Sequence, residues 1–473
     1  MRGPNYWSVR RHKLIVMVLD LEDLEEKPTN KLPGFYERLV EMFPSMMSHR
    51  CSVGCEGGFF QRVKEGTWMG HVIEHIALEI QTLAGMDCGF GRTRQYGDEE
   101  GVYHVVFNYE VDKVGRYAAK AAVRIAEALI SGDSYDLDED IMEMKELRQS
   151  EGLGPSTASI IAEAEARNIP WIRLNRYSLC QLGYGENQKR IQATVTSQTS
   201  SIGVELACDK EDTKYLLEQA EVPTATGDII RSERGLRDVI DDIGYPIVIK
   251  PINGNHGRGI TTNILDWEGA VKAFDVAKNV SRSVIVERYI TGKDHRLLVI
   301  DNQLVAASLR TPAHVIGDGQ STIEQLVKEE NKDPRRGYGH EKVLTTIDIN
   351  ELTRKVLKEN GMTPESIPAK GEMVLLKDTA NLSTGGTAED VTDHVHPYNK
   401  AMAERISKII DLDICGIDIM TDDIGQPINE NGGAILEVNA GPGFRMHLAP
   451  SKGLPRNVAA NVMDMLFPPG TDF

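Results

Sequence analysis

The stretch Tyr245–Gly259, which reads YPIVIKPINGNHGRG, decides how the second half of the chain folds. An apolar strand ends at Lys250, and a glycine-rich loop follows it. Glycines allow backbone N–H groups to approach phosphate oxygens, and a lysine at the end of a rigid strand places a positive charge beside them. A surface hairpin turn also contains glycines, so this stretch alone leaves a nucleotide site and a simple turn as alternatives.

The length and composition of the chain exclude several classes of protein. The 473 residues are too many for one hydrophobic core, so we expect two or three domains. The net charge of −18 argues against a nucleic-acid partner, because nucleic-acid binding needs a basic face. No apolar run is long enough to span a membrane, and the start of the chain lacks the apolar segment of a signal peptide. The six cysteines do not form a disulfide framework in a chain this long, which favours the cytoplasm.

The first part of the sequence alternates strand-like and helix-like segments, which indicates a small α+β domain. Residues 14–19 (LIVMVL) predict a buried strand, and residues 67–83 predict a helix that Thr67 caps. The polar run SGDSYDLDED at residues 131–140 has no apolar face and indicates a linker. We expect two domains, which occupy residues 1–160 and residues 161–473.

The predicted helix contains the motif HVIEH, in which His71 and His75 are four residues apart. That spacing places both imidazoles on one helix face, where they can bind one Zn²⁺ while Glu74 activates a bound water. A helix with two partly exposed histidines shows the same short pattern, so a metal site requires a third ligand. Glu110 is the first candidate for it, and Glu79 and Glu127 are others. The spacing of a further set fits no familiar zinc pattern, and we interpret its members as structural: His49, Cys51, Cys55 and Cys88.

Polar residues recur on, or at the ends of, apolar segments in the second half of the chain. They are Lys250, Glu287, Asp294, Arg310, Asp418, Glu437 and Asn439. A charged side chain in an apolar strand is costly unless it is paired, hydrated or bound to metal. The oxygens of Asp418, Glu437 and Asn439 suit Mg²⁺ that is shared with nucleotide phosphates. For one such residue an ion pair on a solvent face is the simpler interpretation, but the combination with a lysine and a glycine loop favours a nucleotide site.

From about Asp209 to Met465 the sequence resembles the ATP-grasp ligases. The resemblance implies an α/β (α+β) fold, with a small N-terminal α+β domain and then an ATP-grasp domain that carries a helical insertion. It implies ATP and Mg²⁺ as cofactors, with Mg²⁺ on the three oxygen ligands above. The expected subdivision is a preceding segment at 161–208, a core at 209–465 and an insertion at about 320–370.

The same resemblance assigns roles to individual residues. Two lysines contact the phosphates under a glycine loop, a hinge reads adenine, an acidic residue binds the ribose, and an arginine contacts the transferred phosphate. The lysines match Lys210 and Lys250, and the glycine loop matches Asn253, Gly254, His256, Gly257 and Gly259. The hinge matches Glu287, Tyr289 and Ile290. The ribose-binding residue matches Asp294, and the arginine matches Arg310.

Longer segments resemble the cyanophycin synthetase family, and this resemblance covers nearly the whole chain. The segments are RGPNYWS, QLGYGENQKRIQATVTSQTSSIGVELACDK, PAHVIGDG and NLSTGGTAEDVTDHVHP. Cyanophycin is a polyaspartate backbone with arginine on each β-carboxyl group. The resemblance implies a ligase that activates the C-terminal carboxylate of this polymer as an acyl phosphate, which the amino group of L-aspartate then attacks. The loop residues that can hold this carboxylate or acyl phosphate are Ser383, Thr384, Gly385 and Gly386.

The family resemblance also bears on partners and on the HVIEH motif. It implies the cyanophycin polymer or primer and L-aspartate as partners, without nucleic acid or membrane, and a homo-oligomer that is a tetramer. Some members of the family cut the polymer into primers at a metallopeptidase-like site in the N-terminal domain, and His71, Glu74 and His75 match its motif. The resemblance therefore favours Zn²⁺ here over a plain helix.

The sequence departs from the family in two respects. The full family enzyme carries a Mur-ligase-like domain that opens with a P-loop such as GTNGKT, and no G-K-T or G-K-S occurs here, so we expect arginine addition to be absent from this polypeptide. We also expect another strand before Arg2. The alternatives are a polymerase of β-aspartyl-arginine dipeptides, a glutathione-type ATP-grasp peptide ligase, and a chain that is mainly a zinc-dependent cyanophycin hydrolase.

Overall fold

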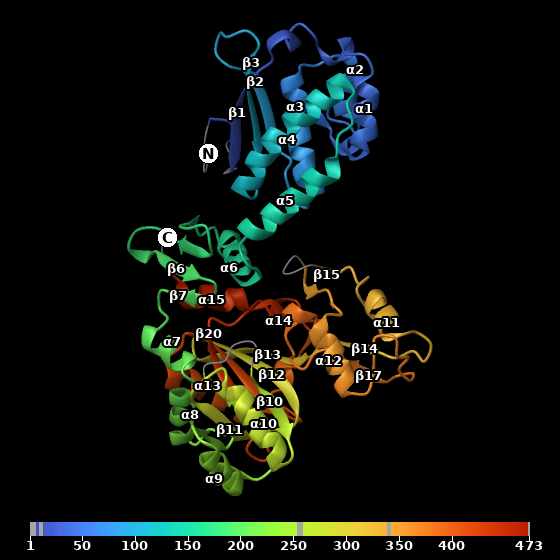
Figure 1. The fold of residues 1–473 in the computed structure, drawn as a ribbon. Coiled ribbons are helices and arrows are strands. Elements are labelled where there is room, and N and C mark those ends of the chain that lie inside the picture. Colours follow the sequence, from blue (N-terminus) through green and yellow to red (C-terminus); the bar gives the residue numbers. More distant parts are fainter. Residues whose placement is uncertain (1–5, 9–12, 253–258, 338–341, 472–473) are drawn as a thin grey trace. The chain divides into compact units, whose positions relative to one another are not determined.

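The computed structural model describes residues 6–8, 13–252, 259–337 and 342–471, which form two compact units (Figure 1). The first unit comprises residues 1–152 and the second comprises residues 153–473. The boundary precedes residue 160 because Ile160 and Ile161 of the next helix pack into a core of the second unit. Among the described residues, no helix is long and apolar enough to cross a membrane.

The first unit is an antiparallel sheet with the strand order β1-β3-β2 and helices packed against it (Figure 1). Its strands are β1 (Leu14–Asp20), β2 (Gly91–Gln95) and β3 (Val102–Asn108). Its helices are α1 (Phe35–Met42), α2 (Gly58–Glu65), α3 (Met69–Leu83), α4 (Asp112–Ser131) and α5 (Leu137–Glu151). The core between α3, α4 and the sheet includes Val72, Ile76, Phe107 and Ile125, all fully buried. The strand predicted at residues 14–19 is confirmed, but it is not buried on both faces, because Leu14 is buried whereas Val16 and Val18 are exposed.

The linker predicted at residues 131–140 is wrong, because the whole run belongs to the first unit. Asp136 caps α5 by accepting a hydrogen bond from the N–H of Glu139 at 3.1 Å. Asp140 is buried, and its carboxylate accepts hydrogen bonds from Tyr117 (2.6 Å) and Arg124 (2.8 Å) of α4. Met144 then enters the core, so acidic residues occur here as a cap and as partners of α4 rather than as a solvated connection.

Outside its insertion, the second unit contains two large antiparallel sheets and a small one with short strands. The small sheet comprises β4 (Trp171–Arg173), β5 (Leu179–Leu182), β6 (Lys189–Gln192) and β7 (Val195–Thr196). A four-stranded sheet, in the order β10-β9-β11-β8, comprises β8 (Gly227–Ile230), β9 (Ile247–Pro251), β10 (Thr261–Ile264) and β11 (Val284–Arg288). A five-stranded sheet, in the order β18-β13-β12-β19-β20, comprises β12 (Lys293–Ile300), β13 (Gln303–Thr311), β18 (Thr387–Asp390), β19 (Ile414–Thr421) and β20 (Ala434–Ala440).

Helices pack against one face of the four-stranded sheet and leave its other face open. Outside the insertion, the described helices of the unit are α6 (Pro155–Ala166), α7 (Ser201–Cys208), α8 (Lys210–Gln219), α9 (Glu233–Ile243), α10 (Trp267–Lys278), α13 (Pro397–Ile410), α14 (Arg445–Leu448) and α15 (Val458–Leu466). Leu236 and Phe274 of α9 and α10 share a core with Val284 and Val286 of β11. Because side chains alternate along a strand, Ile285 and Glu287 face the opposite side.

The insertion forms a small module with a core of its own, around Ile323, Ile347 and Leu357. It contains α11 (Ile323–Glu330) and α12 (Glu351–Glu359), together with the strands β14 (His314–Ile316), β15 (Arg336–Gly337), β16 (Leu344–Thr345) and β17 (Met373–Leu375). The strands pair as β14 with β17 and β15 with β16. The insertion is therefore a mixed module rather than a largely helical one.

Candidate active site and candidate metal centre

A cavity of about 220 Å³ lies between α8, the four-stranded sheet and β20. Its walls combine apolar side chains such as Ile285 and Ile435 with the charged side chains of Lys210, Lys250 and Glu287. A concave site in which apolar side chains and several charged groups converge is typical of small-molecule binding. The sequence prediction named Lys210, Lys250 and Glu287 for the nucleotide, and all three line this cavity.

Glu287 holds two lysines at the cavity wall. Its Oε2 lies 2.6 Å from Nζ of Lys250, and its Oε1 lies 3.1 Å from Nζ of Lys214. Lys214 also donates to the carbonyl oxygen of Gly227 at 3.0 Å. Burial raises the pKa of Glu287, but the ammonium groups of Lys250 and Lys214 outweigh that effect and lower the pKa below its usual value. The carboxylate thus stays charged and holds both ammonium groups at the cavity wall.

A second set of charged residues lies on one face of the five-stranded sheet, because the strand register aligns its members. Arg296 stands opposite Asp418, which in turn stands opposite Glu437. Arg310 stands opposite Asp294, and its Nη2 lies 2.6 Å from Oδ1 of Asp294 and 3.1 Å from Oδ2 of Asp418. Arg296 also donates to both oxygens of Asp418. Burial raises the pKa of Asp418, but the guanidinium groups of Arg296 and Arg310 outweigh burial and lower it.

The residues predicted to bind Mg²⁺ form a donor set of the right chemistry. Carboxylate oxygens of Asp418 and Glu437 come from directly paired positions, and Asn439 pairs with Gly416 on the same two strands. Nδ2 of Asn439 is buried and has no hydrogen-bond partner among the described residues. The side-chain amide of asparagine can be rotated so that its oxygen and nitrogen exchange places. In that orientation the oxygen of Asn439 would take the position of the unpaired nitrogen and could bind a metal ion. Nζ of Lys210 lies 3.9 Å from Oε1 of Glu437, which places a positive charge beside this set.

Other predicted nucleotide residues lie outside the cavity or outside the described chain. Asn253, Gly254, His256 and Gly257 are not among the described residues, whereas Gly259 is described and has a φ of +76°. Tyr289 and Ile290 follow β11, and the N–H of Tyr289 donates to Pro246 at 2.8 Å. Asp294, predicted at the ribose, pairs with Arg310.

The loop Asn381–Gly386 uses most of the groups that were predicted to cradle a substrate. The N–H groups of Thr384 and Gly386 donate to the carbonyl of Asn381, and that of Gly385 donates to Leu382, at 3.1–3.3 Å. The Thr384 hydroxyl also donates to Asn381. Ser383 is exposed, and its hydroxyl has no partner among the described residues, so it is the member of the loop that is free to meet a ligand.

The first unit brings together Cys51, His71 and His75, whose ligand atoms all lie within 4.8 Å of one another. Nδ1 of His71 lies 3.0 Å from the Thr67 hydroxyl, and Nδ1 of His75 lies 2.9 Å from Nδ1 of His49. These contacts occupy the Nδ1 atoms and leave the Nε2 atoms for a metal, and Nε2 of His71 lies 3.2 Å from the Cys51 sulfur. Thr67 therefore orients a histidine, whereas Trp68 occupies the cap position of α3 that was predicted for Thr67.

The carboxylates considered as third ligand lie elsewhere. Glu110 accepts a hydrogen bond from the N–H of Asp87 at 2.7 Å, and Glu127 is exposed on α4. Glu79 accepts a hydrogen bond from Nε2 of His49 at 2.6 Å, and it therefore orients the histidine that contacts His75. The structure thus assembles Cys51, rather than Glu110, with the two histidines. Cys51 and His49 were interpreted as structural. The structure instead places Cys51 with His71 and His75, and it places His49 in contact with His75.

Glu74 lies against β2 rather than in solvent. Its Oε2 accepts a hydrogen bond from the Thr93 hydroxyl at 2.6 Å. A Cβ atom at Gly91 would lie 2.3 Å from Oε1 of Glu74, so glycine is required where this carboxylate approaches the strand. Burial raises the pKa of Glu74 to about 7, although the Thr93 hydrogen bond opposes this shift. A carboxylate that titrates near neutrality is suited to general base chemistry.

The sequence analysis did not name Lys214 and Arg296, which pair with the predicted site residues Glu287 and Asp418. Lys214 carried a usable signal, since it lies one helical turn after Lys210 on the same face of α8. Arg296 also carried one, because it lies two residues after Asp294 and so faces the same side of a strand.

Comparisons with known proteins match both units. Residues 16–131 match the family model of the cyanophycin synthase-like N-terminal domain. Residues 207–322 and 377–466 match the RimK-like ATP-grasp domain, and the interruption at 323–376 corresponds to the insertion.

The chain is similar over nearly its whole length to cyanophycin synthetases. It is 56% identical to that of Trichormus variabilis over 472 residues, which is 99% of this chain and 52% of the relative. It is 53% identical to that of Synechocystis sp. over 477 residues, or 100% of this chain and 54% of the relative. The chain thus spans about half the length of these curated relatives.

A solved structure shares much of this fold. The bifunctional glutathione synthetase from Pasteurella multocida aligns with a TM-score of 0.55 and 28% identity, covering 75% of this chain and 51% of that one.

Proposed function

We propose that this chain, which combines a cyanophycin synthase-like N-terminal domain with a RimK-like ATP-grasp domain, is an ATP-dependent amide ligase that extends the aspartate backbone of cyanophycin. In the proposed reaction a carboxylate oxygen at the C-terminus of the polymer attacks the γ-phosphorus of ATP, which yields an acyl phosphate and ADP. The amino group of L-aspartate then attacks the acyl carbon. The bond from that carbon to the phosphate oxygen breaks, phosphate leaves, and the nitrogen loses a proton as the amide forms.

The described residues divide this work among three groups. Lys250, oriented by Glu287, and Lys210 neutralise the ATP phosphates. Asp418, Glu437 and Asn439 are suited to hold Mg²⁺, which when bound neutralises charge on the phosphates. Arg310, held between two carboxylates, contacts the phosphoryl group in transfer. No nucleophilic side chain is needed, because positioning and charge neutralisation carry phosphoryl transfer.

One observation carries the proposal: Lys210 of α8, Lys250 of the four-stranded sheet and Glu437 of the five-stranded sheet line the same cavity. Lys250 and Glu437 meet there although 187 residues separate them in the sequence. Positive charges for the phosphates and a carboxylate for Mg²⁺ at one cavity are what carboxylate activation by ATP requires.

The direct test is the mass of a purified cyanophycin primer after incubation with this chain, ATP, Mg²⁺ and L-aspartate. A primer heavier by one aspartyl residue supports the proposal. An unchanged primer, under conditions where ATP binds, contradicts it. Addition of β-aspartyl-arginine alone would identify the dipeptide polymerase instead.

A second function is supported by the Cys51, His71 and His75 cluster. We propose that it binds Zn²⁺ through three protein ligands, which leaves a fourth position for water, as in catalytic zinc sites. Glu74 then serves as the base in hydrolysis of the polymer to primers. Shortening of primer without ATP, and protection of the primer by EDTA, would support this activity; loss of zinc without any change in primer length would contradict it.

The family resemblance further suggests a homotetramer in the cytoplasm, which stays a prediction. Light scattering of the purified chain measures the oligomeric state.

A further inference from the structure

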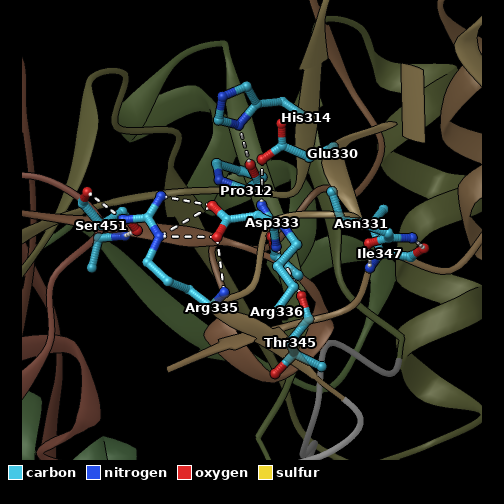
Figure 2. A network of polar contacts seen from close by, with 12 residues as sticks. Pro312, His314, Glu330, Asn331, Asp333, Arg335, Arg336, Thr345, Ile347 and Ser451 are labelled. Carbon is cyan, nitrogen blue, oxygen red and sulfur yellow. Dashed lines mark hydrogen bonds and ion pairs between the residues drawn. The ribbon is translucent and has the colours of Figure 1, made fainter. Parts of the chain in front are cut away.

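The insertion contacts the loop Asn381–Gly386 through a buried arginine. Arg336 of β15 is 4% exposed. Its Nη1 donates to the carbonyl oxygens of Thr345 at 2.8 Å and Gly385 at 3.2 Å, and its Nη2 donates to Glu330 at 2.9 Å. Figure 2 shows Arg336 between Glu330 and Thr345. A guanidinium presents its donors in a fixed planar fork, so these contacts define where the loop lies relative to α11 and β16.

A second arginine reaches the same loop from the other end of the sequence. Arg445, which follows β20, donates through Nη2 to the Thr345 hydroxyl at 2.8 Å and to the Leu382 carbonyl at 3.2 Å. Thr345 therefore receives one arginine at its carbonyl and another at its hydroxyl. The carbonyls of Leu382 and Gly385, which flank Ser383 and Thr384, are each held by one of the two arginines.

Packing supports these hydrogen bonds. Gly385 has a φ of +95°, and a Cβ atom there would lie 2.7 Å from Cγ1 of Ile347, so the insertion presses directly against the loop backbone. Asn331 fixes Ile347 in turn, because its side chain donates to the Ile347 carbonyl at 2.9 Å and accepts from the Ile347 N–H at 2.8 Å (Figure 2).

The loop leads directly into the strand beside Arg310. Thr387, the first residue of β18, pairs with Thr311, and Ala388 pairs with Arg310. A shift of the loop therefore changes the position of Ser383 relative to Arg310, which is proposed to contact the phosphoryl group.

We propose that Arg336 is a positioning residue of the ligase site, which uses the insertion to hold the loop and its free Ser383 hydroxyl where the carboxylate end of the peptide substrate binds. This inference rests on the proposed ligase function and deepens it. Arg336 acts through the loop and does not line the cavity at Lys250, so its loss should affect the carboxylate substrate far more than ATP.

The test compares Arg336→Lys with the matched substitution Arg335→Lys in the full chain. Both keep the positive charge, but Arg335 is half exposed and contacts Asp333 and the Ser451 carbonyl rather than the loop (Figure 2). Initial rates give KM for a purified cyanophycin primer and for ATP separately. Hydrogen–deuterium exchange of the peptide covering residues 381–386 gives a readout that does not depend on activity.

For Arg336→Lys we expect KM for the primer to rise about tenfold, the size of a lost charge-assisted hydrogen bond, with KM for ATP changed less than about twofold. The amides of Thr384, Gly385 and Gly386 should exchange faster, while Arg335→Lys matches the wild type in both measurements. Unchanged primer KM and unchanged exchange would overturn the inference. So would an equal rise in both KM values, or faster exchange throughout the second unit, since either result indicates a general structural defect. If the wild type releases no ADP with primer, the ligase proposal fails, whereas faster exchange confined to the loop in Arg336→Lys would still support the positioning role.

Discussion

Nζ of Lys250 lies 2.6 Å from Oε2 of Glu287, across two neighbouring strands that face the cavity. This contact prepares a positive charge for the ATP phosphates. We predict that Lys250→Met lowers ATP turnover about 100-fold, the usual loss when one preorganised charge is removed from a transition state. Lys272→Met is the control, since Lys272 is exposed on α10 and pairs with Glu268. Equal activity of both variants would show that Lys250 does not contact the transferred phosphate.

The same ion pair predicts how stability depends on pH. The pKa of Glu287 is lowered in the folded chain, so the carboxylate stabilises the fold fully above its unfolded value of 4.5, and this stabilisation is lost as pH falls below 4.5. Near neutral pH, the free energy of unfolding of Glu287→Gln should be about 2 kcal/mol lower than that of the wild type, which is the scale of a hydrogen bond to a charged group. Urea unfolding across the acid range measures the difference, which should shrink towards zero at low pH. A difference that grows as pH falls would contradict the sign of the pKa shift.

Glu437→Ala separates the two proposed activities. Its side chain is 43% exposed, so the fold should tolerate the change, while Mg²⁺ loses a ligand. We expect ATP-dependent synthesis to fall at least about 100-fold and primer hydrolysis to stay as in the wild type. Glu430→Ala, at a turn before β20, is the matched control. If Glu437→Ala still synthesises polymer at the wild-type rate, Glu437 is not a magnesium ligand.

Metal content tests the cluster in the first unit. We predict about one Zn²⁺ for each wild-type chain and its loss in Cys51→Ala and His71→Ala, because each variant removes one of three ligands. Cys55→Ala should keep the metal, since Cys55 is exposed and lies outside the cluster. Elemental analysis after dialysis measures the ratio. Zinc retained by Cys51→Ala but lost by Glu110→Ala would restore Glu110 as third ligand.

Local sequence patterns predicted those parts of the site that depend on one element. A strand that ends in Lys250, and polar residues alternating within the apolar runs of β19 and β20, were visible because side chains alternate along a strand. The histidines of α3 were visible because helical neighbours recur every three to four residues.

Contacts between distant segments were not visible in the sequence. Cys51 precedes His71 by 20 residues, and whether the two meet depends on how the intervening chain folds. The pairing of Arg310 with Asp294, where a ribose contact was expected, depends on the register of two strands. The acidic run at residues 131–140 was misinterpreted because partners on α4, such as Tyr117 and Arg124, are hidden in a linear pattern.

ADP release by this chain with a purified cyanophycin primer tests the proposed ligase most directly, when L-aspartate and β-aspartyl-arginine are added separately. We predict ADP release with aspartate, accompanied by a primer that is one aspartyl residue heavier, and its loss in Glu437→Ala. No ADP release with either amino component, together with primer that shortens unless EDTA is present, would contradict the ligase and leave the metal centre of the first unit as the working site.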